Sequence, residues 1–324
     1  MAPSLRVVQL NAGSLLEPGW DERRHEIVAW IDQLSPDIVC LQEIWESSTQ
    51  ENTAGWIADR AAGEWHTVFG GASIGAEIWP DPDLQFGPAI MSRWPIESAE
   101  RHPLPLAPDP DTFVASIPWA LLHARSAGLD VFATHLVSPP HHAVHRVAQV
   151  LAIDDIIRAT CGGPSESFDA ARREVMPPIL CGDFNAEPDS DEIRFLSSLA
   201  VIDGRSTFYQ DAWRVAGDGG PGHTQDWRTN PIAAALNVHR KRIDYVFVGD
   251  PYGRRDHAGR VLSAVVVFDE TLTGPLASDH AGLAVDIVWP GRPHPPTTDD
   301  DGDDDVDDDD EASARVTEMN EDQP

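Results

Sequence analysis

The start of the chain alternates apolar runs with a helical pattern. Residues 5–10 and 37–44 are apolar runs, and 21–34 repeat apolar side chains at helical spacing. Pro36 ends this helix, because the residue before a proline disfavours the helical conformation. The pattern predicts strand, helix and strand, followed by a second helix across 50–62.

The middle of the chain consists of short apolar runs separated by glycine and proline, which is typical of strands and turns. It predicts strands at 66–69, 88–92, 113–123 and 131–136, surface loops near the mouth of a site at 72–86 and 102–111, and a long helix at 142–161. In that helix, apolar residues such as Val147 and Leu151 recur one turn apart.

The last part of the fold again mixes helix and strand. An apolar run at 178–181 ends in Gly-Asp, and Ser190 is expected to cap a helix with acidic residues in its first turn, where the dipole favours negative charge. After a loop at 203–237, strands are expected at 242–248, 261–268 and 283–288. Helices at both ends of a strand-rich middle predict an α/β fold in which two β-sheets pack face to face between helices.

Composition separates one folded unit, 1–290, from an acidic tail, 291–324. The block at 299–311 is almost entirely aspartate, so it repels itself and cannot bury apolar surface. We expect a disordered, solubilising tail. Calcium chelation is the alternative, although the block lacks the glycine and glutamate spacing of an EF-hand loop.

The formal charge of the chain is −31, from 54 acidic and 23 basic residues. The tail contributes −12, which leaves −19 for residues 1–290. Nucleic acid is bound mainly by cationic side chains that neutralise its phosphates, so this charge argues against a non-specific nuclease. Three cysteines without zinc or disulfide spacing, no leader and no apolar run of membrane-spanning length predict a cytoplasmic protein. No partner protein is expected.

Polar residues follow the apolar runs in both halves of the chain, where the end of a strand presents side chains to a cleft. The set consists of Asn11, Glu43, His135, Asp183, Asn185, Asp244, Asp279 and His280. Carboxylates and amides are ligands for a hard divalent cation, and histidines transfer protons. The set therefore indicates hydrolysis of a phosphate ester, and its presence in both halves indicates an approximate internal duplication.

Glu43 is the first candidate ligand for Mg²⁺, because a charge at the end of an apolar strand has no structural purpose. Asn11 would give the same ion an oxygen or the phosphate an amide, and Asp279 is a third candidate ligand. Each also has an ordinary interpretation, as a strand-end side chain facing water or a turn residue. Mn²⁺ is the alternative ion.

The proton-transfer residues are assigned from their places on strands. Asp183 and Asn185 lie two apart on an extended segment and point the same way, one to deprotonate water and the other to hold a phosphate oxygen. Asp244 lies in an apolar strand, where an unpaired carboxylate is costly, so we pair it with His280, and this pair is the alternative base for the attacking water. His135 is assigned to the leaving group, with a metal-bound water as the alternative, although a lone histidine there is more often a hydrogen-bonded core residue.

Other polar and aromatic residues have two interpretations each. Arg146 would contact a substrate phosphate or form an ion pair on its helix face. Trp227 is a candidate for contacting substrate at the rim. His141, His142 and His145 suggest zinc, but the pattern lacks the glutamate of His-Glu-x-x-His, so a solvated helix start is preferred.

Together these motifs resemble the endonuclease/exonuclease/phosphatase superfamily, the DNase I-like metal-dependent phosphoesterases, over about 5–289. The similarity is carried by Asn11, 41–43, 89–95, 134–136, 182–185, 242–245 and 278–280. It implies a four-layer α/β/β/α sandwich of two mainly antiparallel sheets, with Glu43 on magnesium. It also implies Asp183 and Asn185 at the nucleophile and phosphate, with Asp244 supporting His280.

The motifs are nearer the neutral sphingomyelinase-like and general hydrolase branch than the AP endonucleases. Gly13 stands where AP endonucleases usually have an acidic residue, and Ile44-Trp45 stands in place of their Thr-Lys. We therefore expect a Mg²⁺-dependent phosphodiesterase that acts on a small-molecule or lipid-headgroup diester. Cleavage of DNA or RNA by the same site is the alternative.

Overall fold

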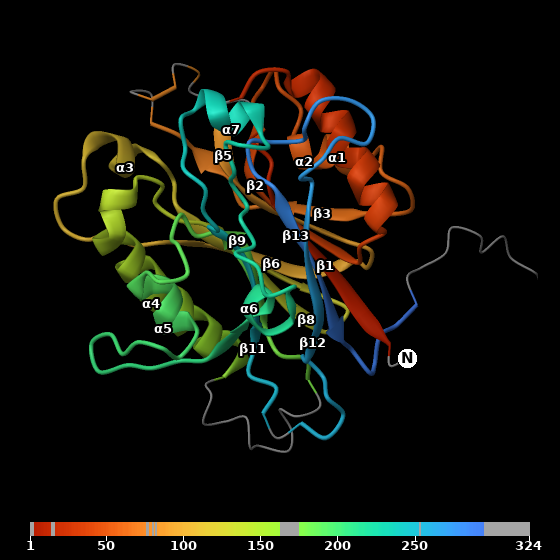
Figure 1. The fold of residues 1–324 in the computed structure, drawn as a ribbon, viewed down its shortest axis with the longest axis vertical. Coiled ribbons are helices and arrows are strands. Elements are labelled where there is room, and N and C mark those ends of the chain that lie inside the picture. The colour runs from red at the N-terminus through yellow and green to blue at the C-terminus, as the bar shows by residue number, and fades with distance from the viewer. Residues whose placement is uncertain are drawn as a thin grey trace, which may run out of the picture.

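A computed structural model of the chain describes residues 3–13, 17–75, 78–79, 81, 83–162, 175–252 and 254–294. Two β-sheets pack face to face, and helices cover their outer faces, as Figure 1 shows. The predicted four-layer α/β/β/α architecture is therefore confirmed.

Each sheet combines strands from distant parts of the sequence. The first sheet has the order β12 (Val261–Val267), β13 (Gly282–Val288), β1 (Ser4–Asn11), β2 (Ile38–Glu46), β5 (Gln85–Ser92) and β3 (His66–Phe69), with β4 (Ala72–Ser73) paired to β5. The second has the order β10 (Tyr209–Asp211), β11 (Asp244–Gly249), β9 (Ile179–Asp183), β8 (Leu129–His135), β7 (Ala120–Ser126) and β6 (Ile96–Pro103).

The helices connect these strands and shield the sheets. They are α1 (Trp20–Leu34), α2 (Thr53–Ala58), α3 (Thr112–Ser116), the 3₁₀ turn η1 (Pro140–His142), α4 (Ala143–Cys161), α5 (Asp191–Leu196), α6 (Ala212–Ala216) and α7 (Pro231–Ala235). In Figure 1, α1 and α2 lie on one side of the paired sheets, and α4 and α5 lie on the other.

The two sheets repeat one arrangement of strands. Each contains one parallel pair, β1 with β2 and β8 with β9, and its other pairings along the sheet are antiparallel. A long helix joins the strands of each parallel pair, α1 in the first half and α4 in the second. This repetition is the one that an internal duplication would give.

Alternation of side chains along the strands divides the core into layers. In β2, Cys40 lies between the two sheets, whereas Leu41 packs in the layer that contains Ile31 of α1. In β8, Phe132 packs in the outer layer with Ile153 of α4. Because a fully buried aliphatic or aromatic side chain contributes about 1.5–3 kcal/mol, these layers hold the strand ends in place.

Two predictions for the middle of the chain are wrong in part. The strand expected at 113–123 is interrupted, because Asp111 Oδ1 accepts the Val114 N–H at 2.8 Å and starts helix α3 before β7 begins. At 96–103, where no strand is expected, β6 pairs with β7. Most β6 side chains are at least partly exposed, so its sequence shows no apolar alternation.

The remaining differences are at loops and element ends. The helix expected across 50–62 is limited to α2, and the loop expected at 203–237 contains β10, α6 and α7. Ser190 precedes α5 as expected, but its side chain makes no capping hydrogen bond. The acidic tail lies outside the described residues from 295 onward. Within the described segments, no helix is long and apolar enough to cross a bilayer.

Candidate active site

The strand ends of both sheets meet around a cavity of about 520 Å³. Polar residues that line it include Glu17, Glu43, His135, Asp183, Asn185, Gln225, Lys241, Asp279 and His280. Asn11 and Asp244 lie behind this lining and are buried. The structure thus brings together the polar residues that the sequence places at strand ends.

Asn11 links the two sheets at the base of the cavity. Its Nδ2 donates to Glu43 Oε1 at 3.1 Å and to Asp183 Oδ2 at 3.0 Å. Its Oδ1 accepts the Gly13 N–H at 3.1 Å. The amide therefore orients one carboxylate from each sheet. The contact of Asn11 with a metal ion stays a prediction, and the second lone pair of Oδ1 would be the ligand.

Asp244 and His280 form a buried pair. His280 Nδ1 lies 2.8 Å from Asp244 Oδ2, and Gln9 Nε2 donates to Asp244 Oδ1 at 3.0 Å. Burial alone lowers the pKa of His280, but Asp244, Asp279 and Asp183 outweigh it and raise that pKa well above its usual range. The ring is therefore oriented and held in its charged form by neighbouring carboxylates.

Asp183 lies between the two histidines of the cavity. Its Oδ2 is 3.5 Å from His135 Nε2 and 3.8 Å from His280 Nε2, and its Oδ1 accepts the Asn185 N–H at 2.8 Å. Burial first and the charge of Asp244 second raise the pKa of Asp183, although both histidines oppose the shift. A carboxylate with a raised pKa is a better proton acceptor than an ordinary aspartate.

Two residues of the cavity have left-handed backbone conformations. Glu43 has φ 59° and Asn185 has φ 49°. Glu43 lies where the pairing of β2 with β5 shifts register between Leu41 and Ile44, so a bulge turns its side chain out of the regular alternation. Such conformations cost of order 1–3 kcal/mol for a residue other than glycine and are common at functional sites.

Three carboxylates among the residues that line the cavity lie close enough to interact electrostatically, those of Glu17, Glu43 and Asp279. Burial, followed by the charges of Glu43 and Asp279, raises the pKa of Glu17 to about 9. Burial is also the main cause that raises the pKa of Glu43, with Asp279 adding to it and His135 opposing it. Clustered oxygen donors whose charges repel one another fit a hard divalent cation such as Mg²⁺.

The group of Asp183, Asp244 and His280 is a second possible metal-binding set, since its ligand atoms lie within 4.8 Å of one another. Two of these residues already bond to each other, through Asp244 Oδ2 and His280 Nδ1. This leaves Asp183 and the second ring nitrogen as the members that face the cavity.

Sequence reasoning missed Glu17 and Gln225. Glu17 follows β1 at a place where the sequence has no periodicity. The one sequence feature related to it is Gly13, because the Cβ of any other residue there would lie 2.0 Å from Glu17 Oε2. Gln225 Nε2 donates to Asp279 Oδ2 at 2.9 Å, and its amide lies beside the His280 ring, so Gln225 contacts two predicted residues. No motif identifies Gln225, which lies in the long loop before β11.

The structure does not place Arg146 in the cavity. Its guanidinium is buried, donates to Glu192 Oε1 at 2.8 Å, and also donates to the carbonyls of Val137, Pro139 and Pro140. Arg146 thus pairs with a residue of another helix, α5, whereas the alternative considered from the sequence was a pair on its own helix face. Trp227 is 47% exposed with its ring 5.6 Å from the Arg228 guanidinium, and it is not among the residues that line the cavity.

Comparison with known proteins identifies a family and similar folds. The model of the Endonuclease/Exonuclease/phosphatase family matches residues 8–280. No curated protein matches the chain. A solved endonuclease/exonuclease/phosphatase structure from Beutenbergia cavernae DSM 12333 is 23% identical, with a TM-score of 0.61, over 88% of this chain and 71% of that one.

Two other solved structures share the fold at low identity. D. rerio TDP2 complexed with single strand DNA product is 19% identical, with a TM-score of 0.61, over 88% of this chain and 98% of that one. The human Nocturnin catalytic domain with bound sulfate is 20% identical, with a TM-score of 0.56, over 88% of this chain and 93% of that one. These similarities concern the fold and do not identify a substrate.

Proposed function

Because the chain belongs to the endonuclease/exonuclease/phosphatase family, we propose that this metal-dependent phosphoesterase uses Mg²⁺ to hydrolyse a phosphodiester of a small molecule or a lipid headgroup. The observation that carries the proposal is the convergence of carboxylates from Glu17, Glu43, Asp183 and Asp279 with two histidines in one cavity. A phosphate is repelled by such a cavity unless a cation is bound there.

Glu43 and Asp279 would hold the ion, with Glu17 completing the set of carboxylates. All three offer oxygen, which Mg²⁺ and Mn²⁺ both accept. Stabilisation of negative charge on the phosphate oxygens is the chemistry that such an ion supplies when bound.

The proton transfers are assigned to groups around Asp183. Asp183 takes a proton from the attacking water, and Asp244 orients His280 so that its charged ring stabilises the developing negative charge. His135 donates a proton to the leaving oxygen from the other side of Asp183. Asn185 holds the phosphate in place beside the base.

An apolar pocket beside Glu43 and His135 supports a small substrate. It has a volume of about 100 Å³ and is lined in part by Trp45, Trp79, Phe86 and Trp119. The Trp45 ring centroid lies 5.3 Å from that of Trp79 and 4.7 Å from that of Phe86. A pocket of this size fits a short alkyl or quaternary ammonium group, since aromatic faces bind both.

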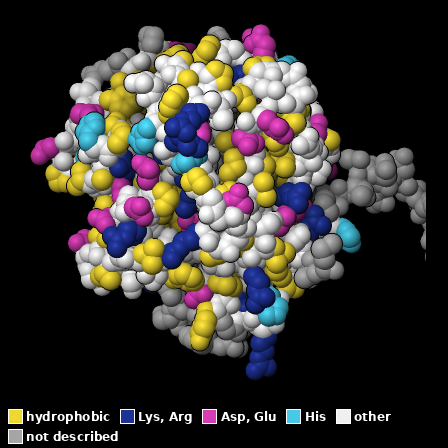
Figure 2. Space-filling model, in the orientation of Figure 1, with side chains coloured by type: hydrophobic (Ala, Val, Ile, Leu, Met, Phe, Trp, Pro, Cys, Tyr) yellow, Lys and Arg dark blue, Asp and Glu magenta, His cyan; other side chains and the backbone are white. Residues whose placement is uncertain are grey.

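Cleavage of nucleic acid is the second candidate function, and Lys241 at the cavity is the observation in its favour. TDP2, which has a similar fold, carries a single strand DNA product in its structure. Against it, Figure 2 shows acidic, basic and histidine side chains interspersed among apolar ones, not a continuous basic stripe on this face. We therefore rank the nuclease below the small diester.

Hydrolysis of bis(p-nitrophenyl) phosphate tests the proposed activity. We expect turnover with Mg²⁺, loss of turnover with EDTA, and recovery when Mg²⁺ is added in excess. Glu43→Gln should remove nearly all turnover, whereas Glu64→Gln, outside the cavity, should retain it. Wild-type turnover by Glu43→Gln would overturn the metal assignment.

Assays against sphingomyelin, inositol phosphates, nicked plasmid and single-stranded DNA distinguish the two functions. Preferential turnover of sphingomyelin or an inositol phosphate diester would support the proposal. Preferential turnover of either nucleic acid would replace it with the nuclease.

A further inference from the structure

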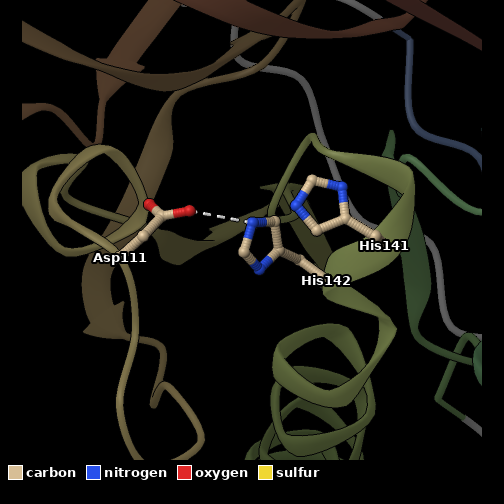
Figure 3. A group of neighbouring side chains, drawn as sticks. All are labelled: Asp111, His141 and His142. Carbon is tan, nitrogen blue, oxygen red and sulfur yellow. Dashed lines mark ion pairs between the residues drawn. The ribbon is translucent and has the colours of Figure 1, made fainter.

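Two histidines and a carboxylate lie together outside the residues that line the catalytic cavity. Figure 3 shows that Asp111 faces the rings of His141 and His142, although about thirty residues separate it from them. His142 Nε2 is 3.0 Å from Asp111 Oδ2, and the ligand atoms of the three residues lie within 4.8 Å of one another.

The backbone on both sides of this group is fixed. Asp111 caps α3 with Oδ1, which leaves Oδ2 facing His142. His141 and His142 belong to η1, directly before α4. The next turn holds His145, whose Nδ1 accepts the Ala107 N–H at 3.0 Å and so ties the loop before α3 to the start of α4.

We propose that Asp111, His141 and His142 bind one transition-metal ion of the Zn²⁺ class. Zinc takes imidazole nitrogen at about 2.0–2.1 Å and carboxylate oxygen at about 2.0–2.2 Å, which sets tetrahedral ligand atoms about 3.4 Å apart. Asp111 and His142 are already closer than this, and the exposed His141 ring, whose ligand atom lies within 4.8 Å of theirs, would rotate to bring the third ligand into range. Water completes the coordination.

The donor set separates this site from the catalytic one. Two imidazoles with one carboxylate favour Zn²⁺, Ni²⁺ or Cu²⁺, whereas the oxygen donors of the cavity suit Mg²⁺. The sequence alone shows three neighbouring histidines without the glutamate of a zinc motif. The third ligand, Asp111, comes from another segment and becomes visible only in the fold.

The site would act as a clamp on one wall of the catalytic cavity. Phe113 of α3 lines that cavity, and so do Pro140 of η1 and Pro139 directly before it. An ion shared by Asp111 and the two histidines would hold these segments together. Because it would bind the folded chain only, it would also raise the free energy of unfolding.

Titration calorimetry of the full chain with Zn²⁺ tests the proposal. The protein is first stripped of metal and saturated with Mg²⁺, so that the oxygen-rich cavity and the acidic tail are filled. We expect wild type to bind one more Zn²⁺ per chain than Asp111→Asn, His141→Gln or His142→Gln, or to bind it at least ~10-fold more tightly. Zn²⁺ should raise the unfolding temperature of wild type more than that of these variants.

His25→Gln is the matched control, since His25 is exposed on α1 in another layer of the molecule. It should bind Zn²⁺ as wild type does. Asparagine keeps the capping oxygen at position 111, so a folded Asp111→Asn chain is expected, and circular dichroism checks it. Equal Zn²⁺ stoichiometry and affinity in wild type and all three site variants would overturn the proposal and leave only an exposed ion pair.

Discussion

His280 depends on Asp244 for both its orientation and its charge. Burial lowers the pKa of the ring, and Asp244 makes the largest of the carboxylate contributions that raise it, ahead of Asp279 and Asp183. The same dependence of one side chain on its neighbours applies to Asp183 and Glu17. The chemistry of the cavity is therefore decided by pairs of residues.

Asp244→Asn should reduce kcat by about 10²–10⁴-fold, because the ring loses the group that orients and charges it. The fold should persist, since asparagine has nearly the same shape. Steady-state kinetics with bis(p-nitrophenyl) phosphate measures the change. Asp286→Asn, which alters a partly exposed pair with Arg6, is the control and should keep its kcat. Unchanged kcat in Asp244→Asn would contradict the assigned pair.

The raised pKa of Glu17 predicts how the free energy of unfolding of the metal-free protein changes with pH. Its pKa is raised from 4.5 to about 9, so the native state keeps a proton that the unfolded chain releases above 4.5. The contribution of this bound proton to the free energy of unfolding is fully present below pH 4.5 and is lost as the pH rises to about 9. In EDTA, wild type should therefore lose more free energy of unfolding across this window than Glu17→Gln.

Urea unfolding at a series of pH values measures that difference. Equal pH slopes for wild type and Glu17→Gln would contradict the burial of the Glu17 carboxyl. In wild type, added Mg²⁺ should bind more tightly as the pH rises, because the proton on Glu17 must leave first.

At the scale of elements, each long helix holds the loop that leads to it from the strand before. Arg23 of α1 donates to the carbonyls of Ala12 and Gly13, directly after Asn11. Arg146 of α4 donates to the carbonyls of Val137, Pro139 and Pro140, shortly after His135. In each half of the chain, a buried arginine of the long helix thus holds the segment that follows the first strand of the parallel pair, β1 or β8.

Arg146→Met should lower the free energy of unfolding by about 3–5 kcal/mol, because it leaves Glu192 buried without its partner. The double variant Arg146→Met/Glu192→Met should recover part of that loss. Urea denaturation measures both. Arg194→Met removes an exposed pair with Asp191 on α5 and should change the value by about 0–1 kcal/mol. Equal losses of unfolding free energy in Arg146→Met and Arg194→Met would show that the buried pair stabilises the fold no more than the exposed one.

At the scale of the whole molecule, the site exists because two sheets face each other. Asn11 and Glu43 come from the first sheet, and Asp183 and Asp244 come from the second. Gln9 and Asn11 form hydrogen bonds across the gap. The cavity is therefore a property of the packed pair of sheets, and neither sheet forms it alone.

The acidic tail should be separable from this catalytic body. Removal of residues 295–324 is expected to leave kcat/KM for a small diester within about twofold of wild type, since the cavity is built from residues before 281. His294 is retained because its carbonyl accepts from Trp94 Nε1 at 3.3 Å. Kinetics and thermal unfolding of the two chains measure the effect. Loss of activity on truncation would contradict the predicted boundary at residue 290.

Local sequence patterns predicted most of the strands and long helices, because alternation and helical spacing report directly which face of an element is buried. They predicted β1, β2 and α4, and they failed at β6, whose side chains are mostly exposed. The polar residues at strand ends were visible for the same reason: each interrupts an apolar run. The sequence by itself thus determined the layered fold and the residue types of the site.

Apart from the Asp244–His280 pair, which the sequence predicted, tertiary structure decided which side chains of the site meet. Glu17, Gln225 and Asp111 lie in loops or at helix caps, where no periodicity indicates a direction, and their partners are distant in sequence. The same holds for Arg146, which contacts Glu192 and backbone carbonyls, because a buried guanidinium is stable only where carboxylates and carbonyls surround it. Contacts of this kind depend on how loops pack over the sheets, and that packing is a property of the whole chain.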